Sequence, residues 1–141
     1  MIICLDTNVL QALIQIPHIF NADAERLIID AREANHRFMV CPIVYTEAFG
    51  IPGFKKEIFG LFLTGLGAEI DWLMPIETWE IAGKAQIDFL ARRRKLGLQG
   101  EKRVLPDFLI GAHALARGAA LMTFDENRYR TSFPKLKLIT K

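Results

Sequence analysis

The sequence lacks most of the features that mark secreted, membrane-spanning or disulfide-stabilised proteins. It contains two cysteines, Cys4 and Cys41, and both fall within apolar stretches, which is typical of buried, reduced thiols. No apolar run reaches the roughly 18 residues that a membrane-spanning helix needs. The first residues show neither the charged segment nor the cleavage site of a signal peptide. We therefore expect a cytoplasmic protein without a membrane segment.

A strong charge imbalance and a zinc-ligand pattern are also missing. The formal net charge of +2 is too small to indicate a partner, although a local cluster of cations could still bind nucleic acid. His18, His36 and His113 are far apart in the sequence and do not show the spacing of zinc ligands. We expect all three to lie on the surface or in helix packing.

The size and composition are those of one globular domain spanning residues 1–141. About half of the residues are hydrophobic (51%) and a quarter are charged (24%), which excludes a disordered chain. Short apolar runs alternate with longer stretches of helical periodicity. This alternation predicts an α/β fold, in which helices cover both faces of a mostly parallel sheet.

The apolar runs and the Pro and Gly positions place the elements along the chain. Strands are expected at residues 2–5, 37–41, 70–74, 119–124 and 136–139. Helices are expected from near residue 9 and over residues 21–34, 43–50, 54–68, 77–95 and 106–117, with a polar turn at 126–130. The helix over 54–68 is apolar over much of its circumference, which is typical either of a core helix or of an interface.

Residues 104–125 form the most informative stretch. Pro106 is suited to a helix start, and Asp107 follows in the first turn, where the helix dipole favours an anion. Gly118 is expected to end the helix in a left-handed conformation. A short buried strand then leads to Asp125. A carboxylate near each end of this unit suggests a metal site.

Two further acids occur where strands end or helices begin. Asp6 follows the first strand, in a position where Asp6, Thr7 or Asn8 could cap the next helix. Glu47 projects from the apolar stripe of the helix over 43–50, which favours a paired or metal-bound carboxylate, although a solvated or salt-bridged side chain remains open. Right-handed crossovers would bring Asp6, Glu47, Asp107 and Asp125 to one edge of the sheet. Clustered acids repel, and Mg²⁺ or Mn²⁺ would neutralise them with oxygen ligands.

The order of these motifs resembles that of the PIN-domain nucleases, and most of all the small toxin ribonucleases of the VapC kind. The resemblance covers essentially the whole chain, and its matching segments are residues 3–10, 46–48, 106–114 and 121–125. It implies a three-layer fold with a five-stranded sheet in the order 3-2-1-4-5. It also implies a divalent-metal-dependent endoribonuclease that hydrolyses RNA phosphodiester bonds with Mg²⁺ or Mn²⁺.

The resemblance also implies roles for single residues. Asp6, Glu47 and Asp107 would be the catalytic acids that hold the metal, with Asp125 as the fourth. Two polar residues, Asn8 and Thr123, would orient these ligands or a water molecule by hydrogen bonds. Proteins of the VapC kind usually dimerise and pair with an antitoxin, so a homodimer and an antitoxin partner are expected. The apolar helix over 54–68 would suit the antitoxin.

A cluster of cations stands outside the family motifs. It comprises Arg92, Arg93, Arg94, Lys95, Lys102 and Arg103. The cations at the helix end are favoured by the helix dipole and could simply be solvated. Contact with the RNA backbone is the functional alternative.

Two other functions fit part of the pattern. A phosphohydrolase or phosphotransferase of the haloacid-dehalogenase type would use Asp6 as a covalent nucleophile, but its pattern requires a second acid where this chain has Asn8. A non-catalytic RNA- or protein-binding module would use the acids as helix caps or as ligands of a structural metal. The presence of acids at all four positions argues against such a module.

Overall fold

The computed structural model describes residues 1–97 and 105–141. A five-stranded parallel sheet with the strand order β3-β2-β1-β4-β5 lies at its centre. The strands are β1 (Ile2–Leu5), β2 (Arg37–Val40), β3 (Ala68–Ile70), β4 (Ala120–Met122) and β5 (Leu138–Ile139). The α/β fold and the expected strand order are therefore confirmed.

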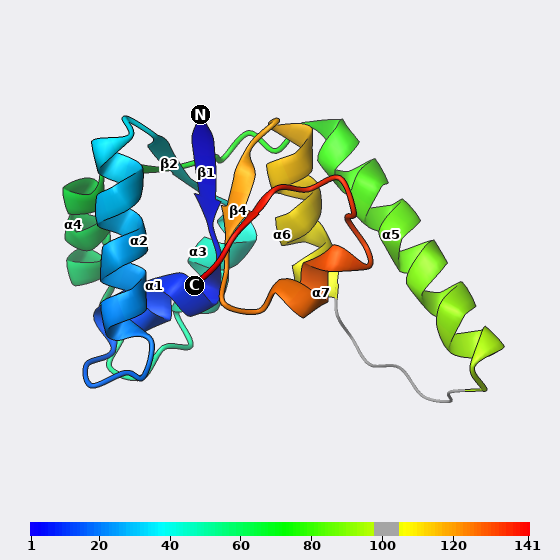
Figure 1. The fold of residues 1–141 in the computed structure, drawn as a ribbon, viewed down its shortest axis with the longest axis horizontal. Helices are drawn as coiled ribbons and strands as arrows, with labels where there is room; N and C mark the ends of the chain where they lie inside the picture. The colour runs from blue at the N-terminus through cyan, green and yellow to red at the C-terminus, as the bar shows by residue number, and fades with distance from the viewer. Residues whose placement is uncertain (98–104) are drawn as a thin grey trace.

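Helices pack on both sides of this sheet. They are α1 (Thr7–Ile14), α2 (Asn21–Glu33), α3 (Pro42–Ala48), α4 (Lys56–Leu66), α5 (Ile76–Lys95), α6 (Leu105–Ala116) and α7 (Glu126–Arg130). Figure 1 shows α2 and α4 at one end of the molecule and α5 at the other, with β1 and β4 between them. No helix in the described ranges is long and apolar enough to cross a membrane.

The central strands are buried because helices cover both faces of the sheet. Ile3, Cys4 and Leu5 of β1 are almost fully buried, as is all of β4. The same burial raises the pKa of the Cys4 thiol to about 12 and that of Cys41 to about 11. Both cysteines are free and buried, as expected.

Two expected elements differ from the structure. The third strand is present, but its predicted bounds of residues 70–74 are wrong, because Gly67 ends α4 in a left-handed conformation (φ 70°) and β3 begins directly at Ala68. The predicted polar turn over 126–130 is the helix α7, whose Tyr129 is fully buried. In α5 the small Ala82 and Ala85 are buried, whereas Trp79 is about half exposed.

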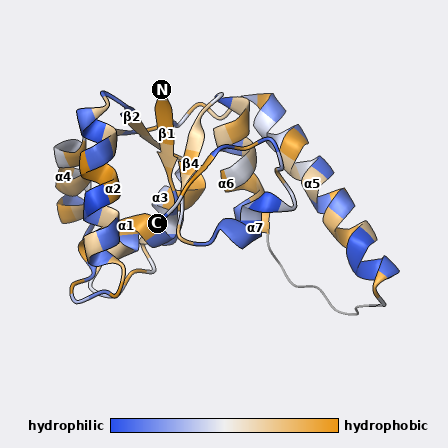
Figure 2. Cartoon of the chain, in the orientation of Figure 1, coloured by the Kyte–Doolittle hydropathy of each residue, from blue (hydrophilic) through white to orange (hydrophobic). Residues whose placement is uncertain are grey.

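The sequence left open whether this helix lies in the core or forms an interface, and α4 has both a buried and an exposed apolar face. Phe59 and Leu63 are buried in the core, whereas Ile58 and Leu61 are 60% and 73% exposed. The helix therefore has a core face and a separate apolar face that is open to solvent. Figure 2 shows that hydrophobic residues also lie on the outer side of α4.

Candidate active site

Asp6 is the acid of the site whose orientation is fixed by the most hydrogen bonds. It follows β1 directly and caps α1, where its Oδ1 accepts a hydrogen bond from the Thr7 backbone N–H at 2.7 Å. Its Oδ2 accepts from the Thr123 hydroxyl at 2.7 Å and from the Tyr129 hydroxyl at 3.0 Å. The residue is only 4% exposed, and these donors fix its orientation.

Asn8 and Thr123 lie against Asp6, where the family resemblance places them. The Asn8 amide donates to Asp6 Oδ2 at 3.3 Å and to Thr123 Oγ1 at 3.2 Å. Asn8 Oδ1 accepts from the Phe124 backbone N–H at 3.1 Å. The network therefore ties the end of β1 to the end of β4, and the orienting role of these two residues remains a prediction.

Glu47 lies at the rim of the same site. It is exposed, because its position on α3 faces solvent and not the core that the sequence pattern suggested. The Thr7 hydroxyl donates a 2.7 Å hydrogen bond to Glu47 Oε1. Since Thr7 directly follows Asp6, this bond places Glu47 next to the acid at the end of β1.

Asp107 and Asp125 are joined by one guanidinium group. Asp107 lies in the first turn of α6 with a side chain that is 18% exposed, and Asp125 caps α7 with a side chain that is 39% exposed. Arg128 Nε lies 2.6 Å from Asp125 Oδ2, and Arg128 Nη1 lies 3.4 Å from Asp107 Oδ1. Arg128 thus forms an ion pair with both acids.

The pKa shifts show that three of the acids share one electrostatic environment. Burial raises the pKa of Asp6, in opposition to its hydrogen bonds from Thr123, Tyr129 and Thr7. Burial also raises the pKa of Asp107, as do the charges of Asp6 and Glu47, while Arg128 lowers it. Asp107 therefore lies close enough to Asp6 and Glu47 to be repelled by both.

The donor set suits a hard divalent cation, but the side chains are not arranged around one. Carboxylate oxygens are the ligands that Mg²⁺ and Mn²⁺ prefer. Within the described ranges, no three His, Cys, Asp or Glu side chains converge closely enough to hold a metal ion. Asp107 and Asp125 are turned toward Arg128 instead. Metal binding therefore requires these side chains to rotate away from the guanidinium.

The predicted cation cluster divides in the structure. Arg92 and Arg93 are half-buried and line a cavity beside Asp107, whereas Arg94 and Lys95 are exposed at the end of α5. Figure 2 shows this end of α5 as strongly hydrophilic. Lys102 and Arg103 lie outside the described residues.

Sequence reasoning missed three residues of the site: Thr7, Arg128 and Tyr129. Tyr129 contacts Asp6 although 123 positions separate them. For Tyr129 the available signal was its position between the apolar residues Phe124 and Phe133, which indicates a buried side chain. A buried tyrosine usually finds a partner for its hydroxyl. For Thr7 and Arg128 no such signal exists, since their partners depend on how the strand ends are juxtaposed.

A second polar cluster lies away from these acids. The buried His113 of α6 has its Nε2 at 2.8 Å from Asp71 Oδ2, and the guanidinium of Arg117 binds both oxygens of Asp71 at 2.6 and 2.9 Å. This cluster attaches the segment after β3 to α6. His113 therefore serves helix packing, as expected for a histidine without ligand spacing.

The family assignment follows from this fold and from a direct match. The model of the PIN domain matches residues 3–134, so the chain belongs to the PIN-domain family. No curated protein matches the chain in a sequence comparison.

Solved structures with the same fold are chains of toxin–antitoxin complexes. One match is the structure of VapBC2 from Rickettsia felis bound to a DNA fragment from its promoter. It has a TM-score of 0.64 and 23% identity over 100% of this chain and 99% of that one. VapBC-1 from nontypeable Haemophilus influenzae matches with a TM-score of 0.66 and 21% identity, over 99% and 98%. A toxin–antitoxin complex from Klebsiella pneumoniae matches with a TM-score of 0.55 and 19% identity, over 97% and 95%. The fold is therefore shared along nearly the entire length of these chains.

Proposed function

We propose that this protein is a divalent-metal-dependent endoribonuclease and the cytoplasmic toxin of a toxin–antitoxin pair. The observation that supports this function best is the meeting of Asp6, Glu47 and Asp107 at one edge of a PIN-domain sheet. Asp6 and Glu47 both raise the pKa of the partly buried Asp107 by repulsion, and acids gathered in this way cost stability unless a positive charge offsets them. Their presence is explained by a cation that binds there.

The chain's own residues would hold and orient the reacting groups. A bound Mg²⁺ or Mn²⁺ would activate water and stabilise the charge that develops on the phosphodiester. Asp6, Glu47 and Asp107 would hold the ion, and Asp125 would contribute at its outer side. Thr123 and Tyr129 keep Asp6 in one orientation through their hydroxyl groups.

The test is cleavage of a structured RNA pool with Mg²⁺ or Mn²⁺ by the wild type, Asp6→Ala and Asp107→Ala. Asp30→Ala, which removes an exposed acid from α2, is the matched control. We expect activity in the wild type and the control, and its loss in both site variants. Equal cleavage by all four proteins would mean a contaminating nuclease and would overturn the mechanism.

Metal binding gives a readout that does not depend on cleavage. Titration calorimetry with Mn²⁺ should detect binding to the wild type and to Asp30→Ala, and strongly reduced binding to Asp107→Ala. Binding of equal strength to Asp107→Ala would exclude Asp107 as a ligand.

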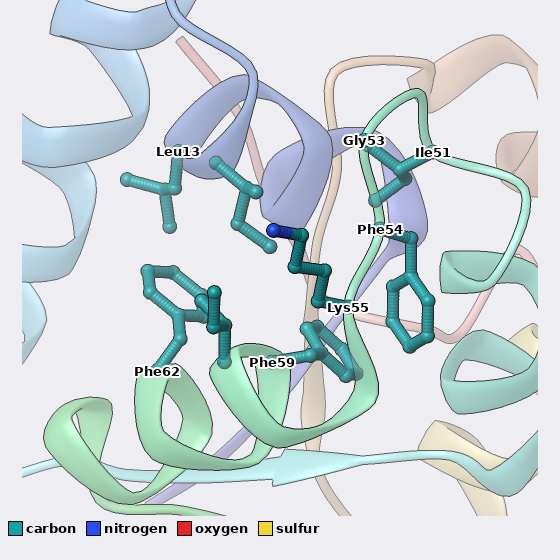
Figure 3. A pocket seen from close by; sticks show the side chains of 9 residues that line it. Leu13, Ile51, Gly53, Phe54, Lys55, Phe59 and Phe62 are labelled. Carbon is teal, nitrogen blue, oxygen red and sulfur yellow. The ribbon is translucent and has the colours of Figure 1, made fainter.

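An apolar cavity next to α1 supports the proposed antitoxin partner. It has a volume of about 260 Å³ and is lined by Leu13, Ile14, Ile51, Gly53, Phe54, Lys55, Ile58, Phe59 and Phe62. Figure 3 shows Phe62 and Lys55 reaching into the space between α1 and α4. An amphipathic helix typically binds such a groove through its apolar face. Because Asp6 caps the other end of α1, only about 10 Å of helix separates the cavity from the acids.

The partner proposal rests on the complexes in which the similar folds were solved, and it has its own test. Co-expression with the reading frame next to the gene should yield a complex that inhibits cleavage. Ile58→Glu should release that partner, whereas Ile29→Glu, a similarly exposed position on α2, should retain it. Retention by both variants would place the partner elsewhere.

The non-catalytic binding module remains the second candidate. It is favoured by the absence of three metal-competent side chains in close contact within the described ranges. It predicts that RNA binds without being cleaved in either Mg²⁺ or Mn²⁺. The cleavage assay therefore decides between the two functions.

A further inference from the structure

A cavity distinct from the apolar groove opens between α5, α6 and α7. It has a volume of about 340 Å³, at the small end of the range of roughly 300–1,000 Å³ for ligand pockets. Its lining residues are Phe89, Arg92, Arg93, Asp107, Phe108, Asn127, Arg128, Thr131 and Ser132. Figure 1 shows the three helices that contribute to it lying beside one another.

The charged groups of this cavity favour an anion. Its lining contains three guanidinium groups, from Arg92, Arg93 and Arg128, and one carboxylate, that of Asp107. Arg128 already forms ion pairs with Asp107 at 3.4 Å and with Asp125 at 2.6 Å. Arg92 is half-buried and has no hydrogen bond or ion pair with any residue in the part of the chain that the structure describes. An arginine in this setting is suited to bind phosphate through its planar fork of donors.

Neutral hydrogen-bond donors and a pair of contacting aromatic rings complete the cavity. Ser132 and Thr131 contribute hydroxyl groups and Asn127 an amide. Arg93 lies over the ring of Phe89 at 5.6 Å, and this ring contacts Phe108 in an edge-to-face arrangement at 5.5 Å. Phe108 is buried in the core. The guanidinium of Arg93 therefore rests on a fixed surface, which reduces the entropy lost when it binds a ligand.

The geometry points to a phosphate-binding subsite in which Arg92, Arg93 and Arg128 hold a backbone phosphate of single-stranded RNA next to the scissile bond. The inference rests on the proposed function and deepens it. Asp107 lines the cavity and also belongs to the acid cluster, so a phosphate held here belongs to a nucleotide adjoining the reacting one. The Arg128 guanidinium pairs with Asp107 through Nη1 and with Asp125 through Nε, which leaves its Nη2 group to donate to the RNA phosphate.

The test measures binding of a fluorescein-labelled single-stranded RNA hexamer in EDTA, where no divalent metal supports hydrolysis. Anisotropy is recorded for the wild type, Arg92→Gln and Arg128→Gln over a series of salt concentrations. We expect each variant to bind about tenfold more weakly and to lose about 0.7 from the slope of log K against log salt, the value for one phosphate contact on a single strand.

Matched controls separate a built subsite from general attraction by positive charge. Lys84→Gln removes a cation from the same helix as Arg92, and Arg130→Gln removes one from the same helix as Arg128, where it pairs with Glu126. Both should bind within twofold of the wild type. Arg94→Gln should lose much less affinity than Arg92→Gln, because Arg94 is exposed and does not line the cavity. Equal losses at Arg92 and Arg94 would overturn the subsite.

The location of the RNA is checked on the folded protein. In a titration of the ¹⁵N-labelled wild type with the same hexamer, the amide signals of Asn127 and Ser132 should shift. Unchanged signals at both residues, or no binding by the wild type, would overturn the inference.

The outcomes for the subsite and for the proposed function are distinguishable. Metal-dependent cleavage with binding that does not depend on Arg92 leaves the nuclease standing and overturns the subsite. Binding that depends on Arg92, without cleavage in any metal, supports the subsite and overturns the nuclease.

Discussion

At the scale of single residues, the acids of the site differ in how firmly they are held. Asp6 is buried and accepts bonds from a backbone amide and two hydroxyl groups. Asp107 is partly buried and interacts with one guanidinium, while Asp125 is more exposed and pairs with the same group more closely. These differences in burial and pairing give the acids different expected effects on activity and on stability.

Asp125→Asn should reduce RNA cleavage less than Asp107→Asn. Asp107 is the more buried acid, and the negative charges of Asp6 and Glu47 raise its pKa. We therefore expect Asp107 to lie nearer to the proposed ion. We expect a loss of about tenfold for Asp125→Asn, as for an outer-shell residue, and of about a hundredfold or more for Asp107→Asn. Initial cleavage rates at saturating Mn²⁺ measure both, and the reverse order would contradict the ranking.

Asp107→Asn should also stabilise the metal-free protein, and more so at higher pH. The pKa of Asp107 is raised in the folded state, so the folded protein binds the proton more tightly than the unfolded chain does. The contribution of Asp107 to wild-type stability therefore falls as the pH rises from about 4 through its folded-state pKa. Asparagine does not titrate, so the stability advantage of the variant should grow over that interval.

Urea denaturation in EDTA at pH 4 and pH 7.5 measures this difference. Asp30→Asn, at an exposed position on α2, is the control and should show no such growth. A gap between Asp107→Asn and the wild type that is constant or shrinks with pH would disagree with the proposed repulsion among the acids.

At the scale of secondary-structure elements, α6 holds the site in place. All of its residues from Phe108 to Ala114 are buried, because it lies between the sheet and α5. His113 and Arg117 attach the segment after β3 to it through Asp71. Gly111 permits the close approach of Phe133 to α6, since a Cβ atom at position 111 would overlap the buried ring of Phe133. The first turn of the same helix carries Asp107.

Gly111→Ala should therefore destabilise the protein although alanine favours helices. The added methyl group would collide with the rigid ring of Phe133, and overpacking of this kind costs about 1–3 kcal/mol. The free energy of unfolding in urea measures the effect. Gly83→Ala is the matched control, because nothing lies within 4 Å of a Cβ at that position in α5; it should be neutral or slightly stabilising. Equal stability of both variants would contradict the close packing.

At the scale of the whole molecule, exposed apolar side chains of the described residues include two groups that lie on different elements. One surrounds the cavity between α1 and α4 and includes Ile58 and Leu61. The other lies before and at the start of α5 and comprises Trp72, Leu73, Ile76 and Trp79, which are 62%, 82%, 68% and 51% exposed. Exposed apolar patches of this kind mark interaction sites. We propose that the first surface binds the antitoxin and that the second forms the expected homodimer.

Leu73→Asp should convert the proposed dimer to a monomer. A buried, unpaired carboxylate in an interface costs several kcal/mol, whereas the monomer keeps the side chain in water. The backbone oxygen of Leu73 accepts a bond from Arg117, and the substitution leaves that bond intact. Light scattering coupled to size-exclusion chromatography measures the mass. Ile29→Asp, exposed on α2, should remain dimeric, and a wild type that is monomeric at all concentrations would overturn the assignment.

The sequence alone predicted the α/β class from its local periodicity and the strand order from its resemblance to the PIN-domain family, and the structure confirms both. The roles of the four acids remain predictions. Asp6, Asn8, Asp107 and Thr123 adjoin strand ends or helix starts, and sequence patterns mark such positions. The boundaries of β3 and the helical state of 126–130 were not predictable from these patterns, since the left-handed Gly67 and the burial of Tyr129 decided them.

Only the tertiary structure decided which side chains meet. The contacts of Thr7 with Glu47, of Tyr129 with Asp6 and of Arg128 with Asp107 join segments that are 40, 123 and 21 residues apart. Contacts of this kind depend on the register of parallel strands and on the direction in which each helix leaves the sheet. Local sequence encodes neither, because both result from packing the whole core. For the same reason the cavity of Arg92, Arg93 and Arg128 exists only once α5, α6 and α7 are assembled.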